Sequence, residues 1–161
     1  MPQATEQEAY ELLSHLGISY QKVDHPAITS VKNLTFDLPG PQVKNLLLKS
    51  KKGKHIYLVI LPDEKHADLK KLADELAEKR LSFLSEEQMT QLLGVPAGTL
   101  TPLALMHDTE NQIQVVIDAA IDQKDTVGFH PNINTTTLII DFVDFQKILK
   151  YLNHPPIFES L

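Results

Sequence analysis

The sequence predicts a mixed α/β (α+β) fold in which a mostly antiparallel sheet is surrounded by helices. Three observations predict this fold: short apolar runs outnumber helical stretches, pairs of these runs flank short polar turns, and capping boxes mark helix starts. The 161 residues suit one domain with a substantial core, and no repeat, low-complexity segment or linker divides them. We therefore expect a single domain over 1–161.

The first third of the chain predicts one helix and three strands. Thr5-x-x-Glu8 is a capping box, and apolar residues then follow at helical spacing up to Gly17, which favours a helix end. Residues 18–23 are typical of a short strand. The apolar runs 46–49 and 55–61 flank a turn formed by Lys51-Lys52-Gly53-Lys54, so they predict a hairpin.

The remaining elements follow in order. Asp63 predicts the start of a helix that runs to about residue 79, followed by a strand over 81–84. Ser85-x-x-Gln88 is a second capping box, opening a short helix that ends at Gly94. The runs 103–107 and 113–118 predict a second hairpin, residues 137–140 a strand, and Asp141 the cap of a final helix.

Composition excludes several classes of protein. Apolar content of 42% and charged content of 22% are those of an ordinary globular protein, and no apolar run reaches the ~20 residues needed to span a bilayer. The absence of cysteine excludes disulfides, thiolate metal sites and a cysteine nucleophile. The polar start of the chain argues against a signal peptide. We expect a cytoplasmic protein without a membrane partner.

Charge is distributed unevenly along the chain. The net charge of −6 argues against a general nucleic-acid binder, yet residues 1–80 carry +1 and the remainder −7. Residues 44–54 contain five lysines and no acid. Such a patch can contact phosphate even on an acidic protein, although a solvated Lys/Gly turn is the simpler interpretation of the local sequence.

No familiar catalytic or cofactor motif is present. The seven histidines form neither HxH nor HxxxH pairs, and the chain has no GxSxG, GxGxxG or Walker motif, so we expect no metal and no cofactor. Lys44 precedes an apolar run, and His130 stands between Gly128-Phe129 and Pro131. Lys44 is either an ordinary surface lysine or a lysine that binds an anion. His130 is either a histidine that bonds to a nearby carbonyl or a residue of the functional site.

Seven sequence blocks, in order, carry a resemblance that covers most of the chain. They are the His25-Pro26 turn, Leu38-Pro39-Gly40 to Lys44-Asn45-Leu46-x-Leu48-Lys49, the Lys-Lys-Gly hairpin, Asp68-Leu69-Lys70-x-Leu72-Ala73, Arg80-Leu81-Ser82-Phe83, Gly94 to Leu105 followed by His107-Asp108-Thr109-Glu110, and Gly128-Phe129-His130-Pro131-x-x-Asn134-Thr135. Together they resemble the YbaK/ProX family of free-standing aminoacyl-tRNA deacylases, in particular its ProX branch.

The resemblance implies a YbaK-like curved mixed sheet, partly barrel-like, and a metal-free trans-editing deacylase. Its substrate would be the ester of mischarged tRNA, above all alanine on tRNA for proline, with water attack assisted by the ribose hydroxyl. Lys44 would anchor the terminal adenosine and Asn45 would orient the substrate. Backbone amides of Gly98 and Thr99 would contact the carbonyl oxygen, and His130 would line the acyl pocket and limit its size. Asn134 and Thr135 would also bind the substrate.

The expected partners are the acceptor end of tRNA and a prolyl-tRNA synthetase, with no DNA and no membrane. Two other functions stay open: a non-catalytic module that binds tRNA or a synthetase, and a hydrolase of small aminoacyl esters. The acyl group also stays open between alanine, serine, cysteine and proline. The reason is that Pro41, Gln42, Val43, Asn132 and Thr136 differ from the residues more common in the family.

Overall fold

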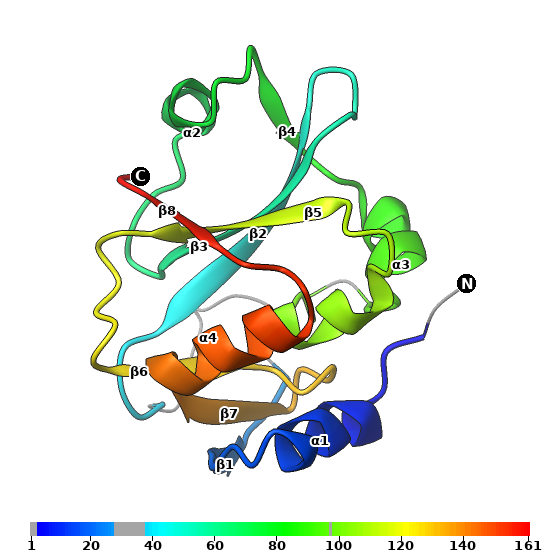
Figure 1. The fold of residues 1–161 in the computed structure, drawn as a ribbon, viewed down its shortest axis with the longest axis vertical. Helices are drawn as coiled ribbons and strands as arrows, with labels where there is room; N and C mark the ends of the chain where they lie inside the picture. The colour runs from blue at the N-terminus through cyan, green and yellow to red at the C-terminus, as the bar shows by residue number, and fades with distance from the viewer. Residues whose placement is uncertain (1–2, 28–37, 97) are drawn as a thin grey trace.

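The computed structural model describes residues 3–27, 38–96 and 98–161, and it places the strands in two sheets (Figure 1). One sheet has three strands in the order β1-β7-β6, and the other has five in the order β4-β2-β3-β5-β8. The helices lie around and between the two sheets. The mixed, mostly antiparallel fold predicted from the sequence is confirmed, since only the β3–β5 and β5–β8 pairings are parallel in the described part of the chain.

The five-stranded sheet is built on the predicted hairpin of β2 (Val43–Ser50) and β3 (Ile56–Pro62). Its turn contains Gly53, whose φ of 68° lies in the left-handed region that favours glycine. β2 begins three residues earlier than expected, so Lys44 and Asn45 lie within the strand rather than at its entrance. β4 (Leu81–Phe83) pairs with the far end of β2.

The predicted second hairpin is wrong. Residues 102–107 form a 3-10 helix, η2 (Pro102–His107), in which Thr101 accepts a hydrogen bond from the Leu103 amide. Pro102 occupies the first helical turn, where its fixed φ and missing N–H are tolerated. β5 (Ile113–Asp118) therefore pairs in parallel with β3, and β8 (Ile157–Glu159), which the sequence did not predict, pairs in parallel with β5.

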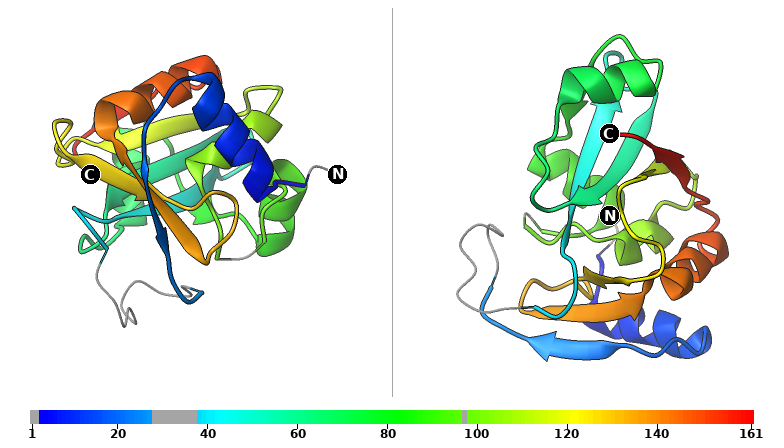
Figure 2. Two further views of the ribbon diagram at one scale, coloured as in Figure 1. Left: turned by 90° about the horizontal axis from the view of Figure 1, so that it is seen from below. Right: turned by 90° about the vertical axis from the view of Figure 1, so that its left-hand side faces the viewer.

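The three-stranded sheet is antiparallel and lies below the larger sheet in the right-hand view of Figure 2. β1 (Gln21–Asp24) and β6 (Thr126–Phe129) flank β7 (Thr136–Asp141), and β6 was not predicted. Pairing between the two sheets is absent from the described ranges, so the partly barrel-like closure expected from the resemblance is replaced by two separate sheets.

The helices follow their capping residues. α1 (Glu6–His15) and α3 (Glu86–Leu93) start at the predicted capping boxes, and α3 ends at Gly94 with φ 72°. α2 (Leu69–Glu75) is capped by Asp68, not by Asp63, whose amide instead donates to the Gln42 carbonyl. α4 (Phe142–Tyr151) begins after Asp141 as predicted, although the Asp141 side chain makes no capping hydrogen bond.

Three groups of buried apolar side chains hold these elements together. A central cluster joins one face of the large sheet to α3, η2, β6 and α4, and includes Leu47, Ile60 and Phe129. An outer cluster joins the other face to α2, and a third joins α1 to β7. Among the helices of the described residues, none combines the length and apolar character needed to cross a membrane.

Candidate functional site

Direct sequence neighbours of three predicted site residues contact the central cluster. Phe129 belongs to this cluster, and Val43 and Leu100 pack against it. These three residues are the direct sequence neighbours of His130, Lys44 and Thr99. The fold therefore gathers the start of β2, the loop after α3 and the loop after β6 around one apolar centre.

Two glycines lie where neighbouring segments approach β6 closely. Gly40 has φ 74°, and a Cβ atom there would lie 2.5 Å from Thr126 Oγ1. A Cβ atom on Gly128 would lie 3.0 Å from a methyl group of Thr137 and 3.4 Å from the Gln42 side-chain oxygen. The contacts at 2.5 Å and 3.0 Å are shorter than almost all real Cβ contacts, so glycine permits the close approach of the segment before β2 to β6 at Gly40 and of β7 to β6 at Gly128.

Lys44 and Asn45 lie on opposite faces of β2. The register with β3 is continuous, with Lys44 opposite Leu61 and Asn45 opposite Ile60. Because side chains alternate along a strand, Asn45 shares the face of Ile60 toward the central cluster, whereas Lys44 shares the face of Leu61 toward α2. The two residues therefore meet different surroundings.

The Asn45 side chain has an unusual polar environment. Its amide oxygen is buried and accepts no hydrogen bond from the residues that the structure describes. A buried polar atom without a partner costs free energy, so such an atom points to a strained or functional position. An amide oxygen can accept only, and it would suit a hydroxyl or ammonium donor.

His130 is held by one ring nitrogen. Its Nδ1 lies 2.9 Å from the Thr136 carbonyl oxygen, which can only accept, so Nδ1 carries the proton. Burial lowers the pKa of His130 below its ordinary value, nearby His25 lowers it further, and the bond to Thr136 opposes both. The ring is therefore neutral near pH 7, and its Nε2 is an acceptor.

His25 is a neighbour of His130 that the sequence interpretation left outside the site. The two rings meet edge to face with centroids 5.9 Å apart. His25 Nδ1 lies 2.9 Å from the Pro26 carbonyl, and Nε2 lies 2.7 Å from Thr137 Oγ1. The signal was present in the sequence, because His25-Pro26 repeats the His130-Pro131 pattern.

The loop between α3 and η2 holds Gly98 and Thr99. Gly98 is exposed with φ 81°, and Thr99 is buried. The Thr99 amide donates to the Pro96 carbonyl at 3.2 Å. Contact between this amide and a substrate oxygen would therefore require the loop to exchange one acceptor for another.

The loop between β6 and β7 is tied to its neighbours by side chains. Asn132, with φ 63°, donates from Nδ2 to the Thr5 carbonyl at 2.8 Å, and Thr136 Oγ1 donates to Asp24 at 2.8 Å. Asn134 is half-buried, and exposed Thr135 accepts from the His25 amide. Asn132 and Thr136 thus position the loop that carries His130.

The site offers hydrogen-bonding and electrostatic chemistry. In the described ranges, histidine, aspartate and glutamate side chains form no group of three or more that could hold a metal ion. The candidate residues supply a buried amide oxygen, a neutral imidazole and a glycine-containing loop, and a cation on the opposite face of β2. Such groups can hold a substrate by hydrogen bonds and by charge.

Comparison with known proteins gives a consistent result. Residues 25–148 match the model of the aminoacyl-tRNA editing domain. The chain is 30% identical to the "Prolyl-tRNA editing protein ProX" of Acetoanaerobium sticklandii, over 86% of each chain. It is 34% identical to the "Prolyl-tRNA synthetase associated domain-containing protein 1" of Xenopus laevis, over 94% of each chain.

Solved structures share the fold at lower identity. One, described as a proposed trans-editing enzyme for prolyl tRNA synthetase, matches with a TM-score of 0.69 and 18% identity, covering 97% of this chain and 95% of that one. Another, "hypothetical protein APE2540", matches with a TM-score of 0.74 and 17% identity, covering 95% of this chain and 97% of that one. At these identities the likeness concerns the fold.

Proposed function

The chain belongs to the family of aminoacyl-tRNA editing domains, and on that premise we propose that it is a free-standing deacylase of mischarged tRNA. Its preferred substrate would be alanine esterified to tRNA for proline. The reaction is hydrolysis of the ester between the amino acid and the terminal ribose. The name of the ProX relative and the resemblance of the motifs support this substrate.

The observation that carries the proposal is the extent of the family match. Residues 25–148 include every candidate residue, from Lys44 and Asn45 through Gly98 and Thr99 to His130, Asn134 and Thr135. Sequence neighbours of Lys44, Thr99 and His130 contact one apolar cluster, which supports a common site for these three segments.

The two faces of β2 support separate roles for Lys44 and Asn45. Asn45 faces the cluster that contains Phe129 and that Leu100 packs against, so its buried oxygen would accept a hydrogen bond from the aminoacyl end. Lys44 faces outward toward α2 and would pair with a phosphate near the terminal adenosine. Hydrogen bonds and charge would thus fix the ester at two points.

His130 would form a wall of the acyl pocket. Its neutral ring can accept a hydrogen bond through Nε2, and its position limits the size of the acyl group. A pocket built for one small side chain discriminates against another by about 1–3 kcal/mol per methylene, which explains why synthetases need a separate hydrolytic sieve. Alanine would fit this sieve, and proline would be excluded by size.

Water would attack the ester carbonyl, and the adjacent ribose hydroxyl of the substrate would assist. The carbonyl oxygen gains negative charge, the bond to the ribose oxygen breaks, and that oxygen takes a proton. An aminoacyl ester is already activated, so positioning and stabilisation of the oxyanion suffice as the contribution of the protein. Backbone amides of the Gly98 loop are the proposed oxyanion donors.

The relatives named for association with prolyl-tRNA synthetase support a second candidate, a module that binds a synthetase. Deacylation of a panel of charged tRNAs by the wild-type protein separates the two. The editing proposal expects rapid loss of alanine from tRNA carrying the proline anticodon, with prolyl-, seryl- and cysteinyl-tRNA as comparisons. Absence of turnover on all four would favour the binding module.

A further inference from the structure

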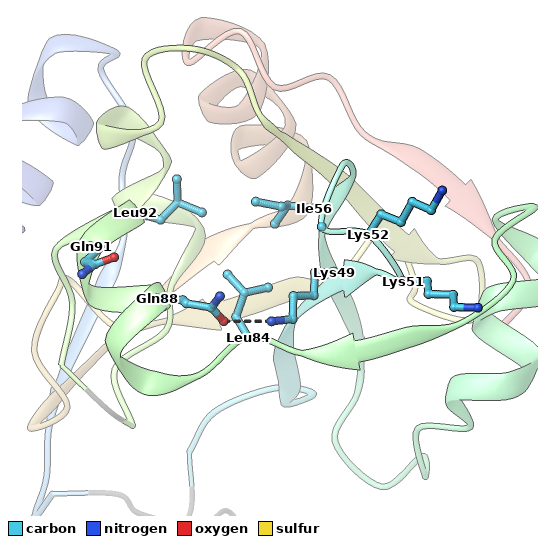
Figure 3. A pocket seen from close by; sticks show the side chains of 9 residues that line it. Lys49, Lys51, Lys52, Ile56, Leu84, Gln88, Gln91 and Leu92 are labelled. Atoms are coloured by element: carbon cyan, nitrogen blue, oxygen red, sulfur yellow. Dashed lines mark hydrogen bonds between the residues drawn. The ribbon is translucent and has the colours of Figure 1, made fainter.

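A second candidate site lies about 17 Å along β2 from Lys44, since Lys49 is five residue steps further along the strand. Here the structure has an open pocket of about 580 Å³ between the β2–β3 hairpin and α3 (Figure 3). Lys49, Lys51 and Lys52 line it together with Gln88 and Gln91, and Gly53 and three aliphatic side chains complete the lining. No carboxylate is among these lining residues.

The polar groups of this pocket suit an anion attached to a larger molecule. Lys49 Nζ donates to Gln88 Oε1 at 3.2 Å, and the same oxygen accepts from the Ser85 amide at 3.0 Å. The Gln88 oxygen is thereby directed away from a ligand, and its amide nitrogen can donate to one. Lysines are point-charge partners of phosphate, and amide nitrogens add directional donors.

Positive charge is a specific property of this side of the hairpin. On the other side, a pocket of about 420 Å³ is lined by Glu75 and Glu159 and by no lysine. Ile56 borders both pockets. An anion would therefore be drawn to the side of α3, which leads directly into the loop of Gly98.

We propose that this pocket, here named the lysine pocket, binds the phosphate backbone of the acceptor arm of tRNA. The inference rests on the proposed function, because α3 and β2 connect the pocket to both ends of the candidate site. An RNA whose acylated end lies beside Lys44 and Asn45 would extend along α3, and its phosphates would meet Lys49, Lys51 and Lys52. The pocket would add affinity without contacting the reacting ester.

The first test is binding of uncharged tRNA, measured by fluorescence anisotropy at several salt concentrations. The triple variant Lys49→Gln/Lys51→Gln/Lys52→Gln is compared with Lys124→Gln/Lys147→Gln/Lys150→Gln, which removes the same charge from exposed sites outside the pocket. The pocket variant should lose affinity about ten-fold or more, and its salt slope should fall by roughly one per lost phosphate contact. The control should bind like the wild type.

Equal affinities for the wild type and the pocket variant would overturn the inference, as would equal losses in both triple variants. Deacylation by the wild type is a separate readout. Turnover with unchanged binding by the pocket variant would sink the inference and leave the proposed function standing. A loss of affinity in the pocket variant, together with no turnover by the wild type, would support the lysine pocket and contradict the proposed deacylase function.

Cross-linking tests which part of the RNA occupies the pocket. Because the chain has no cysteine, Gln91→Cys creates a single attachment point for a photoactivated cross-linker inside the pocket. Lys147→Cys, on the exposed side of α4, is the matched control. Cross-links from Gln91→Cys should map to the acceptor arm. Cross-links to the anticodon arm, or equal yields from both variants, would contradict the assignment.

Discussion

His154 and His130 show two different uses of a histidine in one small protein. His154 is fully enclosed: Nδ1 lies 2.7 Å from the Leu152 carbonyl and Nε2 lies 2.9 Å from Asp108 Oδ2, both side chains being at most 1% exposed. His130 uses Nδ1 in the same way, but the described residues give its Nε2 no hydrogen-bond partner. The first histidine has both nitrogens satisfied by the fold, and the second has one nitrogen that can still accept a hydrogen bond.

Sequence could not tell these two residues apart, because each has a proline close by in a polar loop. The hydrogen-bond partners of each histidine distinguish a structural role from a role in binding. Asp108 also accepts from the amides of Gln112 and Ile113, so the His154 pair joins the end of α4 to the start of β5. His130 is supported by a single carbonyl and a second histidine. We therefore expect mutations to separate stability from activity.

The largest expected effect on stability is from His154→Ala. Removing one partner of a buried pair leaves the Asp108 carboxylate without its side-chain partner, which costs about 3–5 kcal/mol. Urea unfolding followed by circular dichroism measures the change. His66→Ala, at an exposed position, should stay within about 0.5 kcal/mol of the wild type. A loss below ~1 kcal/mol for His154→Ala would remove the distinction between the two histidines.

His130→Ala should change selectivity more than stability. A larger acyl pocket would admit proline, so the ratio of kcat/KM for alanyl- over prolyl-tRNA should fall about ten-fold or more. Single-turnover deacylation of both substrates gives the ratio, with His15→Ala as an exposed control. An unchanged ratio would show that His130 does not set the size of the pocket.

Asn45→Leu should keep the fold and lose activity. Replacing a buried amide whose oxygen has no partner by an apolar side chain of similar shape is nearly neutral or slightly stabilising. We expect a change in the free energy of unfolding within about 1 kcal/mol, together with at least a ten-fold loss of kcat/KM for alanyl-tRNA. Strong destabilisation would instead assign Asn45 a structural role.

The smallest effect concerns pH. Because the pKa of His130 is lowered in the folded state, the unfolded state binds a proton first as the pH falls through the ordinary value near 6.5. The contribution to stability is present above that pH and declines as the pH falls toward the lowered pKa. His130→Gln should flatten this part of the stability curve. An identical pH dependence in both proteins would contradict the neutral state assigned to His130.

The sequence was most informative where the local signal is strong. Capping boxes at Thr5 and Ser85 located two helices, and the Lys-Lys-Gly turn located the hairpin that carries Lys44. The predictions from the sequence were wrong where contacts between distant segments determine the secondary structure. The apolar run 103–107 was interpreted as a strand, but Pro102 and the Thr101 cap start a 3-10 helix there. The three-residue β8 has too little pattern to be predicted.

The candidate site shows the same division. The motifs around Lys44, Gly98 and His130 identified which residues to consider. They could not show that Lys44 and Asn45 face opposite sides of β2, because the strand was expected to begin only at residue 46. Nor could they show that the Thr99 amide is engaged or that His25 lies beside His130, since both depend on contacts between separate segments.

The most direct test of the account is the rate of alanine release from tRNA carrying the proline anticodon, measured for the wild type, Lys44→Ala and Lys22→Ala. Lys22 is an exposed lysine paired with Asp24 on β1 and serves as the matched control. We predict rapid release by the wild type and by Lys22→Ala, and a loss of about 100-fold or more in Lys44→Ala, as expected when a residue that positions the substrate through its phosphate is removed. Equal rates for Lys44→Ala and the wild type, or no release by any of the three proteins, would contradict it.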